Sequence, residues 1–348
     1  MSGKLKTAVL GASGYSGLAL TRILDRHPRL EAPVLLSRED GDDRPQDLAD
    51  IFPELSGNGG YPLRPLSWRE LKRQGVQLLF LATPEETSRS LVPEAISQGL
   101  RVIDLSGAWR LKQARHAAIY SFQDADSVTA AELTDMAIYG LPELNGACIA
   151  AAQLVANPGC YATSVILALA PLLKAGLIDR EHGIISDSKS GVSGAGKVPT
   201  SRTHFVAVAD NLSVYSVFNH RHLGEIVEQL DLSESGLTFT PHLLPIPRGI
   251  LSTIYVRLNQ PMSAEQVESC LREFYLGKRW VRIFATPRLP QLQFSLHTNF
   301  CDLGFCLAKD GRRLVLVSCV DNLLKGAAGQ AVQNMNLMCG WGEQEGLQ

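Results

Sequence analysis

Hydrophobic positions in the first half of the chain gather into short apolar runs separated by longer amphipathic segments. Short apolar runs predict buried β-strands, and the amphipathic segments between them predict helices. We expect strands at 4–10, 32–36, 76–82, 100–105 and 154–156, and helices at 18–24, 84–98 and 165–173. Strands that alternate with helices are typical of a parallel sheet covered by helices.

The second half has a different pattern, in which β-type runs follow one another with few helical segments between them. We expect strands at 183–187, 212–217, 237–243, 250–258, 281–284, 301–307 and 314–320, and helices at 223–230 and 264–275. This grouping predicts a mixed or largely antiparallel sheet with helices on one face, which is an α+β domain.

The length of 348 residues also favours two domains. A last helical segment, rich in small residues, begins after 321 and needs an apolar surface on which to dock. We therefore expect one domain formed by 1–157 and 322–348, and a second domain formed by 158–321.

Charge and cysteine content narrow the class of protein. A formal net charge of -2 argues against nucleic acid or an acidic membrane as the main partner. No apolar run approaches the length of a membrane span, and the first apolar run is interpreted as a core strand rather than a signal segment. Seven cysteines without disulfide-type or metal-type spacing fit a reducing cytoplasm and predict no metal site.

A glycine-rich turn joins the first predicted strand to the first predicted helix. Gly11, Gly14 and Gly17 permit a tight turn and a close approach of the backbone to a ligand, and a pyrophosphate can rest on the N-terminus of the helix. We expect a dinucleotide site here, to which Ser13, Tyr15 and Ser16 also contribute. The alternative is an ordinary strand-to-helix turn.

The ends of the next strands indicate the kind of dinucleotide. Ser37 and Arg38 end the second strand, where an NAD site usually has a carboxylate for the ribose hydroxyl. A hydroxyl and a guanidinium suit a 2′-phosphate, so NADP is the expected cofactor, unless Arg38 is only a surface residue. Ligands lie beyond the carboxyl ends of parallel strands, so the cofactor should also border Thr83, Pro84 and Ser106.

The segment 157–163 places one thiol, Cys160, on the first turn of a helix. There the helix dipole and the unpaired N–H groups favour a thiolate, and the same N–H groups can stabilise an oxyanion formed by its attack on a carbonyl. Cys160 is therefore the candidate nucleophile. The alternative is a buried cysteine that merely follows a Pro-Gly turn.

Three later segments, and one arginine, complete the candidate site. The glycine- and serine-rich segment 188–197, with Ser190, Gly191 and Lys197, suits a phosphate or is a flexible loop. Further candidates are Tyr215, His220, His222, Glu225, Asn322 and Arg110. Glu225 follows His222 by three residues and could fix its tautomer, while two histidines separated by one residue are poorly spaced as metal ligands on one helix face. Arg110 could reach an anionic substrate or lie exposed without a role.

Seven motifs follow one another along nearly the whole chain: 11–17, DLSGAWR at 104–110, YGLPE at 139–143, NPGCYAT at 157–163, 188–197, NHRHLGE at 219–225 and 321–336. Together they resemble the N-acetyl-gamma-glutamyl-phosphate reductase family. The resemblance implies a Rossmann-type NADP-binding domain and an α+β catalytic domain of the aspartate-semialdehyde dehydrogenase type. Gly107, Trp109 and Gly224 depart from the family's more usual residues, which affects pocket shape more than catalytic groups.

The resemblance also implies roles for the candidate residues. Cys160 becomes the nucleophile that forms a thioester with an acyl phosphate, with a histidine as acid or base. We assign that role to His220 and substrate contact to His222, although the two could be exchanged. Arg110, Ser190, Tyr215 and Glu225 become substrate-pocket residues, and Ser37, Arg38 and Asn322 contact the cofactor. A cytoplasmic homodimer or homotetramer is implied. A reductase of carrier-bound aminoadipyl phosphate and a non-catalytic NADP-binding regulator are the alternatives.

Overall fold

The computed structural model describes residues 3–37, 47–57 and 60–347, which form two compact units. The first unit comprises 1–112, 120–157 and 328–348, and the second comprises 113–119 and 158–327. The chain crosses from one to the other between Asn157 and Pro158. The chain re-enters the first unit at Ala328, whereas we expected it to do so at 322. The short segment 113–119, which we expected in the first domain, belongs to the second unit.

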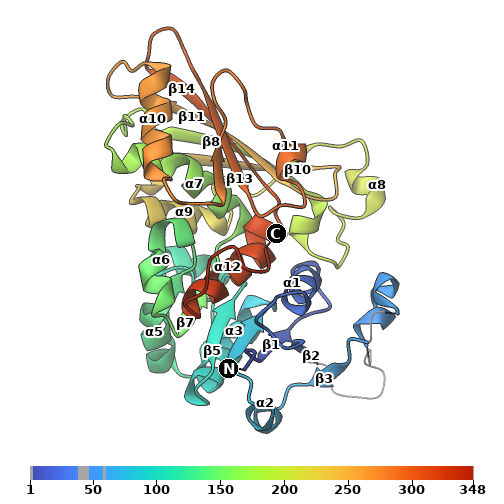
Figure 1. Cartoon of the computed structure of the whole chain (residues 1–348). Helices are drawn as coiled ribbons and strands as arrows, with labels where there is room; N and C mark the ends of the chain where they lie inside the picture. The colour runs from blue at the N-terminus through green and yellow to red at the C-terminus, as the bar shows by residue number, and fades with distance from the viewer. Residues whose placement is uncertain (1–2, 38–46, 58–59, 348) are drawn as a thin grey trace. The chain divides into compact units, whose positions relative to one another are not determined.

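A seven-stranded parallel sheet forms the centre of the first unit, with the order β3-β2-β1-β4-β5-β7-β6 (Figure 1). Apolar side chains from both faces of its strands are buried, as expected for a parallel sheet between helices. The strands are β1 (Thr7–Leu10), β2 (Val34–Ser37), β3 (Leu63–Pro65), β4 (Leu78–Leu81), β5 (Arg101–Asp104), β6 (Ile138–Tyr139) and β7 (Leu154–Ala156).

In the described part of this unit the helices beside the sheet are α1 (Tyr15–Asp25), α2 (Trp68–Gln74), α3 (Glu85–Ser97), α5 (Ser127–Met136), α6 (Pro142–Ala150) and α12 (Gly329–Met338). Short 3₁₀ turns at Leu48–Asp50 and Pro53–Leu55 precede β3. The last helix, α12, packs against α1 and α6 and buries Ala331, Val332 and Met335 completely. Its apolar face therefore docks in the core of the first unit, as a terminal helix requires.

The second unit contains a seven-stranded mixed sheet with the order β12-β13-β14-β11-β8-β10-β9. Two of its neighbouring pairs, β12 with β13 and β8 with β10, are parallel, and the others are antiparallel. The strands are β8 (Ile184–Gly191), β9 (Ser213–Val214), β10 (Leu237–Leu244), β11 (Ile250–Arg257), β12 (Val281–Ile283), β13 (Cys301–Leu307) and β14 (Arg313–Val320).

The helices of the second unit are α4 (Ala114–Ala117), α7 (Cys160–Lys174), α8 (Phe205–Val208), α9 (His222–Leu230), α10 (Ala264–Phe274) and α11 (Leu292–Ser295). Helix α7 packs on β11, β13 and β14, with α9 and α10 beside it (Figure 1). All of α7 from Tyr161 to Leu173 is buried, because its side chains are nearly all apolar and it lies between the sheet and the other helices. No helix in the described part of the chain is long and apolar enough to span a membrane.

The elements β3, α2, α5, β6 and α6 were not predicted from the sequence, and two predicted strands differ markedly in extent. β8 runs on through Gly191, so Ser188 and Ser190 belong to a strand rather than to a loop. β9 covers only Ser213–Val214, because Ser216 has a positive φ of 47° that ends the extended conformation. The predicted strand at 212–217 is therefore wrong over most of its length.

Candidate active site

The glycine turn after β1 is shaped by close backbone contacts. A Cβ on Gly11, which has φ of 90°, would lie 2.3 Å from the carbonyl oxygen of Ala82, and a Cβ on Gly17 would lie 2.1 Å from that of Gly11. Only glycine fits at these positions. Gly14 is the N-cap of α1, with no side-chain cap and no acidic residue in the first turn. The N-terminal N–H groups of α1 are thus available to an anion such as a pyrophosphate.

The neighbouring strand ends contribute one hydroxyl suited to a ligand. Thr83 follows β4, and no hydrogen-bond partner for its buried Oγ1 occurs among residues 3–37, 47–57 and 60–347. Pro84 is the N-cap of α3, and Ser37 ends β2 half-buried. Ser106 already donates its hydroxyl to Asp104, whose burial raises the pKa of that carboxyl. Arg38 lies outside the described residues.

Arg110 is buried in the first unit, with 6% of its surface exposed. Its guanidinium donates hydrogen bonds to the backbone carbonyls of Asn157, at 2.7 Å, and Leu105, at 2.6 Å. The expected anionic substrate would have to compete with these carbonyl groups. The geometry favours a role in fixing the segment that ends at Asn157, directly before the chain enters the second unit.

Cys160 opens helix α7 in the second unit, with Gly159 as the N-cap and no side chain capping it. The thiol is partly exposed, and no acidic residue occupies the first turn. Both features favour a thiolate at this position. A Cβ on Gly326 would come within 2.8 Å of the Cβ of Cys160. The small residues predicted after 321 therefore allow that segment to pack directly on the nucleophile candidate.

Glu225 and His222 lie against the peptide that precedes Cys160. The fully buried carboxylate of Glu225 accepts a hydrogen bond of 2.9 Å from the N–H of Gly159. Its other oxygen lies 3.9 Å from Nε2 of His222. A Cβ on Gly159 would lie 2.5 Å from the same Nε2, so this ring edge covers the entry to α7. The burial of Glu225 and its bond to Gly159 suit a role in holding this peptide, and its contact with the substrate stays a prediction.

His220 occupies a different environment from His222 although only one residue separates them. Its ring packs edge-on against Tyr161, Tyr215 and Phe239. Burial, with Arg221 as a smaller contribution, lowers the pKa of His220 to about 4. Its Nδ1 accepts the N–H of His222 at 3.1 Å, so the single proton of the neutral ring lies on Nε2. Near neutrality His220 is therefore an uncharged hydrogen-bond donor.

Tyr161 links these groups to the sheet and was not predicted as a site residue. Its hydroxyl donates to the carbonyl of His242 at 2.9 Å and accepts from the Tyr215 hydroxyl at 3.3 Å, and it also contacts Ser190. Burial raises the pKa of Tyr161 and raises that of Tyr215 to about 12, so both phenols stay protonated. The position of Tyr161 immediately after the cysteine was the available signal.

Gly191 and Asn322 meet at the end of β8. A Cβ on Gly191 would lie 2.6 Å from the backbone N of Arg248, and Asn322 donates to the Ser193 hydroxyl at 3.0 Å and accepts from the N–H of Gly249 at 2.6 Å. The neighbouring Asp321 accepts the N–H groups of residues 323 and 324. Lys197 lies exposed beyond this cluster.

The family of the protein follows from comparisons with known proteins. Residues 6–152 match the model of the semialdehyde dehydrogenase NAD binding domain, and 160–322 match that of the semialdehyde dehydrogenase dimerisation domain. N-acetyl-gamma-glutamyl-phosphate reductase from Desulfotalea psychrophila is 43% identical over 99% of this chain and 98% of its own length. The Bacillus subtilis protein of the same name is 40% identical over 99% of this chain and 98% of its own length. The chain belongs to the N-acetyl-gamma-glutamyl-phosphate reductase family.

Solved structures agree with this membership at the level of fold. Aspartate semialdehyde dehydrogenase II from Vibrio cholerae superimposes with a TM-score of 0.70 at 18% identity, covering 97% of this chain and 99% of that one. Aspartate semialdehyde dehydrogenase from Francisella tularensis superimposes with a TM-score of 0.68 at 16% identity, covering 96% of this chain and 100% of that one. The resemblance and the fold class expected from the sequence of this reductase-family chain are thus confirmed, as is a nicotinamide dinucleotide domain in its first half.

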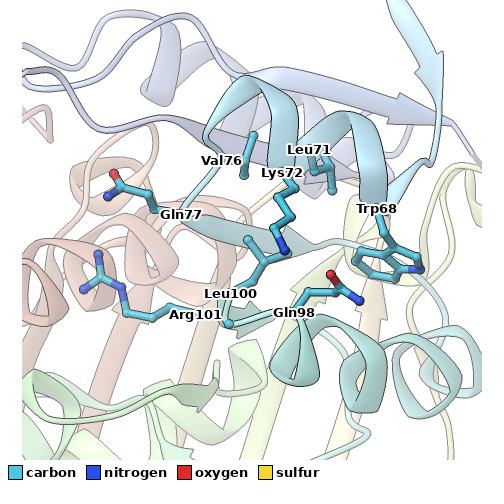
Figure 2. A pocket seen from close by; sticks show the side chains of 9 residues that line it. Trp68, Leu71, Lys72, Val76, Gln77, Gln98, Leu100 and Arg101 are labelled. Atoms are coloured by element: carbon cyan, nitrogen blue, oxygen red, sulfur yellow. The ribbon is translucent and has the colours of Figure 1, made fainter.

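A groove elsewhere in the first unit is separate from the glycine turn. It has a volume of about 460 Å³ and is lined by Trp68, Leu71, Lys72, Val76, Gln77, Gln98, Gly99, Leu100 and Arg101 (Figure 2). Trp68, Leu71 and Lys72 come from α2, and the other lining residues lie at or just before the amino ends of β4 and β5, whereas dinucleotides bind at carboxyl ends. Arg101 is engaged there in a 2.7 Å bond to the carbonyl of Met338, at the end of α12. In the described residues, no cluster of histidine, cysteine and acidic side chains could hold a metal ion.

Proposed function

We propose that this chain reduces N-acetyl-gamma-glutamyl phosphate with NADPH to N-acetyl-glutamate semialdehyde and phosphate, as a step of arginine biosynthesis. The observation that carries the proposal is the placement of Cys160 on the uncapped first turn of α7, beside the His222–Glu225 pair. Membership in a family whose relatives carry the reductase name supplies the substrate.

The first half-reaction forms an acyl-enzyme. The Cys160 thiolate attacks the carbonyl carbon of the acyl phosphate, the bond from that carbon to the phosphate oxygen breaks, and phosphate leaves with the electron pair. The N–H groups at the start of α7 and the Nε2–H of His220 are the donors proposed for the oxyanion. The product is a thioester on Cys160.

The second half-reaction releases the aldehyde. NADPH, when bound, supplies the hydride that reduces the thioester carbonyl carbon. The oxyanion left on the substrate oxygen accepts a proton from protonated His222, and the neutral His222 ring takes that proton back while the carbon–sulfur bond breaks and Cys160 leaves as the thiolate. We prefer His222 to His220 for this step, because the Glu225 carboxylate stabilises a positive charge on the His222 ring, whereas His220 stays neutral.

The first unit would hold the dinucleotide through the turn at Gly11, Gly14 and Gly17 and through Thr83. The tight turn and the uncapped start of α1 suit a pyrophosphate. Ser37 and the adjacent Arg38 favour a ribose 2′-phosphate, which makes NADP the proposed cofactor.

Steady-state kinetics with three acyl phosphates tests the substrate. We expect the highest kcat/KM with N-acetylglutamyl phosphate, and far lower values with glutamyl phosphate and with aminoadipyl phosphate. A preference for carrier-bound aminoadipyl phosphate would replace the proposal with the lysine-type reaction. Absence of turnover with all three would favour a non-catalytic regulator.

We also propose that the protein works as a homodimer or homotetramer in the cytoplasm. Large apolar side chains are exposed in the segment before the histidines: Val198, Phe205, Val206, Leu212, Val214 and Phe218, with 77%, 83%, 79%, 58%, 51% and 68% exposure. This apolar segment lies in the domain described as a dimerisation domain, so a second copy is its proposed partner. All seven cysteines are free, as suits a reducing compartment.

A further inference from the structure

A chain of hydroxyl groups crosses the sheet of the second unit beneath helix α7. It consists of five serines and one cysteine, each with 0% exposure. The neighbouring oxygens, and the sulfur at one end, lie at hydrogen-bond distance from one another. In order, the chain runs from Ser186 through Ser188, Ser252, Ser164 and Ser318 to Cys301. The distances between successive side-chain oxygen or sulfur atoms are 3.2, 2.8, 2.9, 2.9 and 3.5 Å.

The strands hold three of these serines side by side. Ser252 on β11 is paired in register with Ser188 on β8 and with Ser318 on β14. Ser164 comes from α7, and its hydroxyl lies between Ser252 and Ser318. A hydroxyl donates one hydrogen bond and accepts two, so each serine oxygen in the chain can be satisfied. The row joins the helix to three strands, β8, β11 and β14.

Few polar side chains anchor α7. Besides Ser164, the hydroxyl of Tyr161 donates to the carbonyl of His242, while Tyr275 and Cys270 donate to backbone carbonyls of the helix. The buried side chains from Val165 to Leu173 are aliphatic or alanine, apart from Pro171, and such contacts have no preferred direction. A hydrogen bond has a preferred direction and a narrow distance range. Ser164 therefore opposes rotation or sliding of α7 along the sheet in a way that its aliphatic neighbours do not.

Ser164 lies four residues after Cys160, one helical turn away on the same face. Cys160 lies against Gly326 on one side and directly follows the peptide that Glu225 holds. A small shift of α7 would therefore move the thiol relative to these neighbours. We propose that Ser164 is a positioning residue, which holds the first turns of α7 so that the Cys160 thiol keeps its place in the site. The proposal rests on the role of Cys160 in the proposed function.

The test compares Ser164→Ala with Ser186→Ala. Both remove one fully buried hydroxyl from the same chain, but Ser186 lies at its far end on β8. For each purified variant we would measure kcat, KM for the acyl phosphate and for NADPH, the urea midpoint, and the rate of iodoacetamide alkylation of the peptide that contains Cys160 as a function of pH. Alkylation needs no substrate, so it reports on thiol placement even if the proposed substrate is wrong.

We expect both variants to lower the urea midpoint, because each removes at least one buried hydrogen bond from the chain. Ser164→Ala should also lower kcat roughly tenfold to a hundredfold, with nearly unchanged KM for NADPH, and should change the alkylation profile of Cys160. Ser186→Ala should keep kcat within about twofold of the parent, since its lost bond is not to α7.

A parental kcat and alkylation profile in Ser164→Ala would overturn the proposal. An equal loss of kcat in Ser186→Ala would also overturn it, because general loosening of the core would then be the cause. If Ser164→Ala does not fold, Ser164→Cys keeps a weak donor of similar size. We expect kcat in Ser164→Cys to remain within about tenfold of the parent, and a complete loss of activity in this folded variant would contradict a role limited to positioning.

Discussion

The two histidines of the HRH motif show how one residue of separation produces different chemistry. His222 lies at the start of α9, buried beside the Glu225 carboxylate and the peptide of Gly159. His220 lies among aromatic rings, which remove water without supplying a counter-charge. From the sequence we assigned the acid or base role to His220 and substrate contact to His222, and the role proposed above for His222 reverses that assignment. The groups that distinguish the two rings come from distant segments of the chain and could not be read from the motif.

The low pKa of His220 predicts a pH-dependent stability. The unfolded chain protonates His220 below about pH 6.5, whereas the folded protein does so only as pH falls through about 4. The unfolded state thus binds the extra proton between these values, and folding stability falls as pH is lowered from 6.5 towards 4. Between pH 6.5 and pH 5 the contribution is about 2 kcal/mol. Urea unfolding at both values should show a smaller loss in His220→Gln than in the parent, and an equal loss would contradict the assigned environment.

Kinetics of the two asparagine variants tests the division of roles. His222→Asn should lower kcat by roughly a hundredfold or more and flatten one limb of the pH–rate profile, because it removes the group that transfers the proton. His220→Asn should lower kcat while leaving that limb in place, because it removes only a hydrogen-bond donor. If His220→Asn abolished the limb and His222→Asn preserved it, the two roles would have to be exchanged.

At the scale of elements, the apolar pattern predicted most of the core strands and their helices, but it missed β3, β6 and the helices α2, α5 and α6. β7 and β13 have the expected bounds, and α1 begins within the predicted glycine turn. The pattern failed at β8, where Ser186, Ser188 and Ser190 face the interior. Serines are typical of loops, but here each buried hydroxyl has a hydrogen-bond partner: Ser186 and Ser188 bond to other serines, and Ser190 donates to the carbonyl of Gly191. Such partners cannot be found from one sequence.

Arg110 and Glu225 in the candidate site also have hydrogen-bond partners that could not be predicted from the sequence. Both are charged residues that the sequence places near an anionic substrate, and both are buried with backbone partners. The partner of Glu225, Gly159, lies 66 residues away. Backbone donors and acceptors carry no side-chain signature, so the sequence predicted which residues matter but not what they contact.

The packing of the segment before α12 against Cys160 can be tested by substituting Gly326. Gly326→Ala would place a methyl group 2.8 Å from the Cβ of Cys160, so the turn or the thiol must shift. We expect a loss of at least about tenfold in kcat, with the protein still folded by circular dichroism. Gly146→Ala in α6 is the matched control, since its nearest atom would lie 3.9 Å away. Equal activity of the two variants would argue against close packing on Cys160.

At the scale of the whole molecule, the sequence predicts a dinucleotide-binding part followed by a catalytic part. The semialdehyde dehydrogenase models fall on these parts, at 6–152 and 160–322. The segment 113–119 could not be assigned from pattern alone. It joins the second unit because buried His116 lies 2.7 Å from Glu228 on α9.

The proposed self-association of the protein through its exposed apolar segment can be tested by introducing charges there. A Phe205→Asp, Val206→Asp variant should weaken self-association, because two charges would enter the proposed apolar interface. Light scattering after gel filtration across a dilution series measures the mass. Leu276→Asp is the control, since Leu276 is 85% exposed but lies outside the apolar segment. A parental mass for the double variant would place the interface elsewhere, whereas a monomeric parent would refute the homo-oligomer itself.

The most direct test of the central claim is to trap the acyl-enzyme. The protein is mixed with N-acetylglutamyl phosphate in the absence of NADPH, quenched in acid within milliseconds to seconds, and examined by mass spectrometry, while released phosphate is measured in parallel. We predict one acyl group per active chain on the peptide that contains Cys160, a matching burst of phosphate, and neither signal in Cys160→Ser. Turnover with NADPH but no adduct and no burst, or an adduct that persists in Cys160→Ser, would contradict covalent catalysis by Cys160.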